Sequence, residues 1–83
     1  MFRDNQELYD VIRALIRTFS EHGEQCFASA LSDAMGISSM PGEVLGELRV
    51  QLRHARTSQL STRLDVRSKI DESIRYIDAV LSS

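Results

Sequence analysis

Residues 21–30, with the sequence EHGEQCFASA, bring together side chains that enzymes and metal sites use. Glu21, His22, Glu24 and Cys26 fall within six consecutive positions. A carboxylate can act as a general base, an imidazole can accept a proton or bind a metal, and a thiolate is a nucleophile or a zinc ligand. The spacing therefore raises two chemical hypotheses, a metal site and a cysteine–histidine nucleophile.

The metal hypothesis rests on His22 and Glu24, whose spacing resembles the first half of the zinc-deaminase signature H-x-E…P-C-x-x-C. The second half has no counterpart, because Cys26 is the sole cysteine of the chain. A structural zinc site requires four protein ligands, and the other histidine, His54, stands among arginines that would repel a cation. The sequence therefore predicts no metal and no cofactor.

A cysteine–histidine nucleophile requires an exposed thiol, a lowered thiol pKa and a base within hydrogen-bond distance. His22 and Cys26 are four positions apart, which places them on one helix face only if a helix continues through Gly23. No neighbouring residue is an evident orienting group or oxyanion hole. We therefore predict that the protein is not an enzyme and has no catalytic residues.

A joint between two helices explains the same stretch with fewer assumptions. His22 would lie in the last turn of one helix, where a positive charge suits the helix dipole, and Gly23 would take the left-handed conformation that closes it. Glu24 would then enter the first turn of the next helix. Cys26 and Phe27 would begin the buried face of that helix, with the cysteine packing as a small apolar residue.

Helical spacing of apolar residues extends over most of the chain, and no sustained alternation predicts a strand. The first helix is expected over about 5–21, with Asp4 and Glu7 as a capping box. Its apolar face consists of Leu8, Ile12, Leu15, Ile16 and Phe19. The second helix is expected to end before Gly36 as the C′ residue. Its apolar face consists of Phe27, Ala30, Leu31, Ala34 and Met35.

Two more helices follow the connection 36–42, which is rich in Gly, Ser and Pro. The third helix has its first turns weakened by Gly42 and Gly46, and its apolar face consists of Leu45, Leu48, Leu52 and Ala55. Residues 57–62 form the next break, where Thr62 and Asp65 are expected to cap the fourth helix. The apolar face of the fourth helix consists of Val66, Ile70, Ile74, Ile77 and Leu81.

Four short helices with short connections predict an all-α fold, a small bundle in which residues 1–83 form a single domain. One alternative stays open, because the helical spacing of apolar residues in the first helix continues unbroken through Gly23 to Cys26. Residues 5–35 would then be one long helix kinked at Gly23, and the bundle would have three helices. We favour the break at Gly23.

The charge, the cysteine content and the apolar segments of the chain indicate the cellular compartment in which we expect the protein. The net charge of −2, with 27% charged residues, gives no strong overall field toward nucleic acid or membrane. A lone cysteine excludes an internal disulfide and fits a reducing compartment. The first residues, MFRDNQELYD, lack the apolar segment of a signal peptide, and no apolar run approaches the roughly 18 residues of a membrane span. The sequence therefore predicts a cytoplasmic protein without membrane contact.

A more specific pattern spans 31–48. The residue types around its turn, at Leu31, Ser32, Met35, Gly36, Ile37 and Ser38, match in order those of the helix-turn-helix unit of DNA-binding proteins, which this segment therefore resembles. The resemblance implies DNA binding through a second helix in the major groove. Pro41 and Gly42 depart from the pattern within that helix, and Glu43 and Glu47 place negative charge where Arg, Lys, Asn or Gln would read bases.

Basic residues gather between positions 49 and 69, opposed there by Asp65 alone. Spacings of four and three residues place the first arginines in one row on the third helix, and the charge continues into the fourth. The predicted basic stripe consists of Arg49, Arg53, Arg56, Arg63 and Arg67. Such a stripe either binds an acidic partner or pairs with acidic residues of its own bundle. Both interpretations stay open, and the stripe is the candidate partner-binding site.

These observations predict a small, non-catalytic helical protein that binds a protein partner. Its size and helicity suit the accessory proteins of bacteria or phage, such as an immunity protein, an inhibitor or a regulatory subunit. DNA binding through residues 31–48 is the alternative. The wide apolar faces of the first and fourth helices also predict a homodimer, because a bundle of this size has too few helices to cover both.

Overall fold

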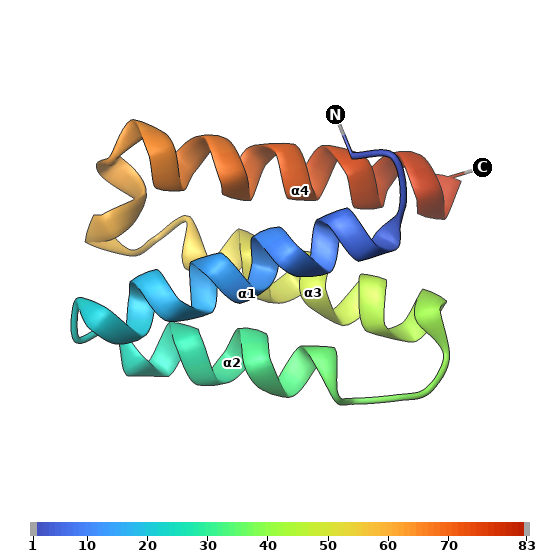
Figure 1. Cartoon of the computed structure of the whole chain (residues 1–83), viewed down its shortest axis with the longest axis horizontal. Helices are drawn as coiled ribbons and strands as arrows, with labels where there is room; N and C mark the ends of the chain where they lie inside the picture. The colour runs from blue at the N-terminus through green and yellow to red at the C-terminus, as the bar shows by residue number, and fades with distance from the viewer. Residues whose placement is uncertain (1, 83) are drawn as a thin grey trace.

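Four α-helices and one 3₁₀ helix make up the computed structural model, which describes residues 2–82 (Figure 1). Their bounds are α1 Asn5–Glu21, α2 Gln25–Met35, α3 Pro41–Ala55, η1 Gln59–Thr62 and α4 Leu64–Ser82. Successive helices run in opposite directions, and α4 returns to pack against α1, which closes an up-down bundle of 34 × 24 × 19 Å (Figure 1). The predicted all-α bundle of four helices is confirmed.

Gly23 ends α1 and separates it from α2. Its backbone is left-handed, with φ at +77°, which costs little only for glycine. The amide of Glu24 donates to the Phe19 carbonyl at 2.8 Å, and the amide of Gly23 donates to the Ser20 carbonyl at 3.3 Å. This pair of bonds is a Schellman motif, which satisfies the last carbonyls of α1. The three-helix alternative, with one kinked helix over 5–35, is therefore not what the chain adopts.

The start of α1 is capped as the sequence predicts, with one difference. The amide of Glu7 donates to Asp4 Oδ1 at 3.0 Å, so Asp4 is the N-cap. The Glu7 carboxylate accepts from the Arg3 amide at 2.6 Å and from Arg3 Nε at 3.0 Å, one residue earlier than in a capping box. These bonds to Arg3 lower the pKa of Glu7.

Three details of the predicted helix ends are wrong. The third helix begins at Pro41, inside the expected connection 36–42, because proline lacks the N–H that a first helical residue would leave unused. Gly36 has a φ of −106° and caps α2 without a left-handed turn. Thr62 does not cap α4, because its hydroxyl donates to the Gln59 carbonyl within η1.

The core lies along the middle of the bundle and matches most of the predicted faces. Its buried apolar residues are Leu8, Ile12, Leu15, Phe19, Ala28, Leu31, Ala34, Val44, Leu45, Leu48, Leu52, Ala55, Val66, Ile70, Tyr76 and Ile77. Phe27, Met35 and Ile74 are only partly buried. Leu81, predicted as core, is 37% exposed because the last turn of α4 reaches the end of the bundle (Figure 1).

Tyr76 ties the start of the chain to α4. Its hydroxyl donates to Asn5 Oδ1 at 2.6 Å, and its ring meets the ring of Phe2 edge-on at 5.5 Å. Burial raises the pKa of Tyr76, and the negative charge of Asp4 acts in the same direction. The folded state therefore favours the protonated phenol that makes this bond.

The glycines at the end of α1 and within α3 predict opposite effects of the same substitution. Gly46 lies within α3, and a Cβ there meets nothing within 4 Å in the described chain, so Gly46→Ala should stabilise the protein by about 0.5–1 kcal/mol. Gly23→Ala should destabilise it by about 1–2 kcal/mol, because alanine is strained in the left-handed region. Urea unfolding of both variants checks this, and a destabilising Gly46→Ala would contradict the helical placement of that residue.

Tyr76→Phe should lower the free energy of unfolding by about 1 kcal/mol at neutral pH, because Asn5 loses its hydrogen bond. The pKa of Tyr76 is raised in the folded state, so its contribution is complete below pH 10 and falls as the pH rises through that folded pKa. The variant should therefore lose less stability than the wild type between neutral and strongly alkaline pH. Urea unfolding across this range is the measurement.

Candidate functional site

Cys26 is exposed, which corrects the prediction that it begins the buried face of the second helix. The break at Gly23 resets the helical phase, so α2 buries Ala28, Leu31 and Ala34. Cys26 precedes Ala28 by two residues, which turns it about 200° around the helix axis, to the outer side. Phe27 is partly buried, and its ring contacts the rings of Phe19 and His54, each at 5.7 Å between centroids.

His22 belongs to the joint between helices. Its Nδ1 lies 2.9 Å from the Thr18 carbonyl, so this nitrogen carries the proton and donates it. Its Nε2 is then the acceptor for Arg63 Nη1 at 3.2 Å. Both ring nitrogens are therefore engaged, and the ring connects the end of α1 to the start of α4. His22 and Cys26 lie on either side of the break and do not share a helix face.

The described part of the chain contains no cluster of side chains that could bind a metal ion. Within residues 2–82, no group of three or more His, Cys, Asp or Glu side chains is arranged to hold a metal ion. The described helices also include none that is long and apolar enough to cross a membrane.

The basic stripe is assembled over α3 and α4 around two shared carboxylates. Arg49 Nη1 donates to Asp78 Oδ1 at 2.9 Å, and Arg53 Nη2 lies 3.8 Å from the same oxygen. Asp78 is 45% exposed, so solvent reaches this group from outside. One carboxylate thus holds two guanidinium groups of the third helix.

Asp71 has the same role nearer the start of α4. Arg56 Nε lies 3.2 Å from Asp71 Oδ1, and Arg67 Nε lies 3.9 Å from Asp71 Oδ2. Asp71 and Asp78 are seven residues apart, two turns of α4, and therefore lie on one side of that helix. We call the surface formed by Arg49, Arg53, Arg56 and Arg67 the arginine face.

Arg63, the fifth arginine of the predicted stripe, lies apart from the arginine face. Its guanidinium pairs with Asp65 at 3.1 Å and donates to His22. It therefore helps to close the end of the bundle where α1 meets α4. The sequence groups Arg63 with the stripe by position alone, and the fold directs it elsewhere.

The arginine face carries excess positive charge. Four arginines share two aspartates, which leaves a local charge of +2. Exposed ion pairs of this kind contribute little to stability, about 0–1 kcal/mol each. Arg49 is held by a hydrogen bond to Asp78, and Arg53, Arg56 and Arg67 lie within ion-pair distance of the shared carboxylates. The uncompensated charge remains available for an external anion.

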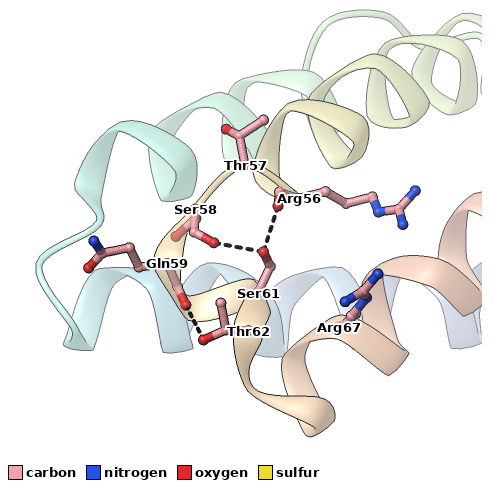
Figure 2. A pocket seen from close by; sticks show the side chains of 7 residues that line it. All are labelled: Arg56, Thr57, Ser58, Gln59, Ser61, Thr62 and Arg67. Atoms are coloured by element: carbon pink, nitrogen blue, oxygen red, sulfur yellow. Dashed lines mark hydrogen bonds between the residues drawn. The ribbon is translucent and has the colours of Figure 1, made fainter.

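A cavity of about 320 Å³ lies at one end of the arginine face, where α3 passes through η1 into α4 (Figure 2). Arg56 and Arg67 line it together with a run of hydroxyl and amide side chains: Thr57, Ser58, Gln59, Ser61 and Thr62. Ser61 Oγ lies 2.6 Å from the Arg56 carbonyl and 2.7 Å from the Ser58 carbonyl, which holds the turn in place. The sequence predicts only a break over 57–62, because local composition does not indicate how α4 lies against the turn.

The segment that resembles a helix-turn-helix forms a different arrangement. α3 runs back along α2 in the opposite direction (Figure 1), whereas the two helices of a DNA-binding unit cross at about 90–120°. Ser38 Oγ donates to the Glu43 carboxylate at 2.7 Å and accepts from the Met40 amide at 3.0 Å. These residues organise the start of α3, and the antiparallel arrangement disfavours insertion of α3 into a major groove.

Comparisons with known proteins give no family assignment: no family model, no curated protein and no solved structure matches this chain.

The outward position of Cys26 predicts rapid modification. A thiol reagent should label the folded protein about as fast as the unfolded chain. Cys26→Ser should change the free energy of unfolding by no more than about 0.5 kcal/mol. As a control, Ala28→Cys in the Cys26→Ser background should react slowly, because position 28 is buried. Slow labelling of Cys26 itself would restore the buried interpretation.

Proposed function

We propose that this chain is a small, non-catalytic helical protein that binds an acidic surface of a protein partner through the arginine face. The observation that carries the proposal is the sharing of Asp71 and Asp78 by four arginines. An immunity, inhibitor or regulatory accessory protein of a bacterial or phage cytoplasm is the class we favour, by analogy of size and architecture.

Order and charge together support recognition by this face. Arginine is enriched at protein interfaces because its planar guanidinium makes several directed hydrogen bonds to carboxylates. A side chain that is already held by an aspartate loses less conformational freedom when a partner binds. Because each aspartate pairs with two arginines, it helps to position their side chains and still leaves the arginine face with a net positive charge.

A protein partner agrees better with the charge distribution than DNA does. The whole chain carries −2, and the arginine face carries +2, so the remainder carries −4. A duplex attracted to the face would bring a long line of phosphates toward this acidic remainder. An acidic patch on a protein is compact and can meet the arginine face alone.

The predicted homodimer has less apolar surface to use than the sequence indicated. On α1, the partly buried Tyr9, Val11 and Ile16 pack against the core of the same chain. The large apolar side chains that stay exposed in the described chain lie outside α1: Ile37, Met40, Val50, Leu64, Val80 and Leu81. We therefore place a different protein partner ahead of a second copy. Sedimentation equilibrium at micromolar concentration decides between about one and two chain masses of 9.4 kDa.

The proposal predicts a partner whose capture depends on the arginine face. The protein immobilised on a resin should retain this partner from a nuclease-treated lysate of the source cells. The double variant Arg49→Gln/Arg53→Gln should weaken retention at least tenfold, about 1.4 kcal/mol, because Asp78 then holds no guanidinium for the partner.

Arg13→Gln is the matched control, since Arg13 also forms an exposed ion pair, with Asp10, but lies on α1. It should retain the partner as the wild type does, and circular dichroism should show all variants equally helical. Equal retention by the double variant would contradict the proposal. A labelled duplex bound with sub-micromolar, sequence-dependent affinity at about 150 mM salt would favour DNA binding instead.

A further inference from the structure

The cavity between α3 and α4 has a preformed wall. Ser58 and Ser61 are 6% and 8% exposed, and both belong to the turn that joins the two helices. Ser58 Oγ accepts from the Leu60 amide at 3.1 Å, and Ser61 bridges two backbone carbonyls. The turn is therefore held by its own hydrogen bonds, and the cavity exists without a ligand to shape it (Figure 2).

Hydrogen-bond donors border this cavity and are not used by the bundle. Arg56 and Arg67 each approach Asp71 through Nε, and within residues 2–82 their terminal Nη groups make no hydrogen bond. Each arginine therefore keeps these N–H groups for a ligand. Arg49 differs, because its Nη1 already donates to Asp78.

The charge around the cavity specifies the kind of anion. Two guanidiniums and the Asp71 carboxylate sum to +1, so one carboxylate neutralises the cluster. A phosphate group carries about −1.5 to −2 near neutral pH and would leave negative charge beside Asp71. Arginine pairs bind carboxylates with directed, charge-assisted hydrogen bonds. A carboxylate therefore leaves the cluster neutral, whereas a phosphate reverses the sign of its charge.

From these observations we propose that the cavity is a binding site for one carboxylate group of the protein partner, held between Arg56 and Arg67. The inference rests on the proposed function, which it deepens by locating where an acidic side chain of the partner inserts. Arg49 and Arg53 then contact the acidic surface around that side chain.

The test uses the free protein and small anions as probes. Propionate, which reproduces the end of a glutamate side chain, and inorganic phosphate are titrated at equal ionic strength while the Nε–Hε signals of the arginines are followed by NMR. Propionate should give saturable shifts at Arg56 and Arg67 with a millimolar dissociation constant, and phosphate should bind more weakly. Arg67→Gln or Arg56→Gln should weaken propionate binding at least tenfold, and Arg13→Gln should not change it.

Asp71→Asn tests the charge of the site through its preference between propionate and phosphate. A purely structural role of Asp71 would leave this preference unchanged. The substitution raises the charge of the cluster from +1 to +2, so the preference should reverse and phosphate should bind more tightly than propionate. Absence of saturable shifts, equal shifts in Arg67→Gln, or an unchanged preference in Asp71→Asn would each overturn the carboxylate site.

The two proposals fail separately. If propionate does not bind but capture of a partner is lost in Arg49→Gln/Arg53→Gln, the carboxylate site is wrong and the proposed function stands. If propionate binds with the expected reversal in Asp71→Asn but no partner depends on Arg49 and Arg53, the cavity binds carboxylates and the proposed function is wrong.

Discussion

The left-handed turn at Gly23 is the constraint on which the rest of the bundle depends. The apolar spacing of residues 5–35 is compatible with one continuous helix, and a long helix would leave its apolar side without neighbours. The Schellman bonds from Gly23 and Glu24 end α1 instead and let α2 fold back along it. The core, the phase of α2 and the outward position of Cys26 all follow from this reversal.

The opposite connection, between α3 and α4, gives the molecule its distinctive surface. The hydroxyl-rich turn 57–62 is fixed by bonds from Ser58 and Ser61 and sets how α4 lies against α3 (Figure 2). That placement brings Asp71 and Asp78 beside the arginines of α3. A surface of this kind adds little to stability, because exposed ion pairs gain little energy in water. In the function that we propose, this surface orders charged donors before a partner binds.

The core that stabilises the fold and the arginine face that we propose as a binding surface are therefore formed by different residues. The core is apolar and continuous from α1 to α4, and among the described residues no buried side-chain nitrogen or oxygen lacks a hydrogen-bond partner. The polar connection from Tyr76 to Asn5 secures the chain start. The arginine face lies outside this core, on side chains that are about one third to three fifths exposed, so its residues can change without removing buried contacts.

The sequence by itself determined the helices, since apolar spacing, the Asp4 cap and the glycine at position 23 are local signals that act within one or two turns. Most core positions followed from the same spacing. The tertiary structure alone decided which acidic residues meet the arginines of α3, because Asp71 and Asp78 reach that helix only after the chain reverses. It also gave Arg63 its partners Asp65 and His22, outside the arginine face. These outcomes depend on helix rotation and on the path of the turns, which sequence neighbours do not encode.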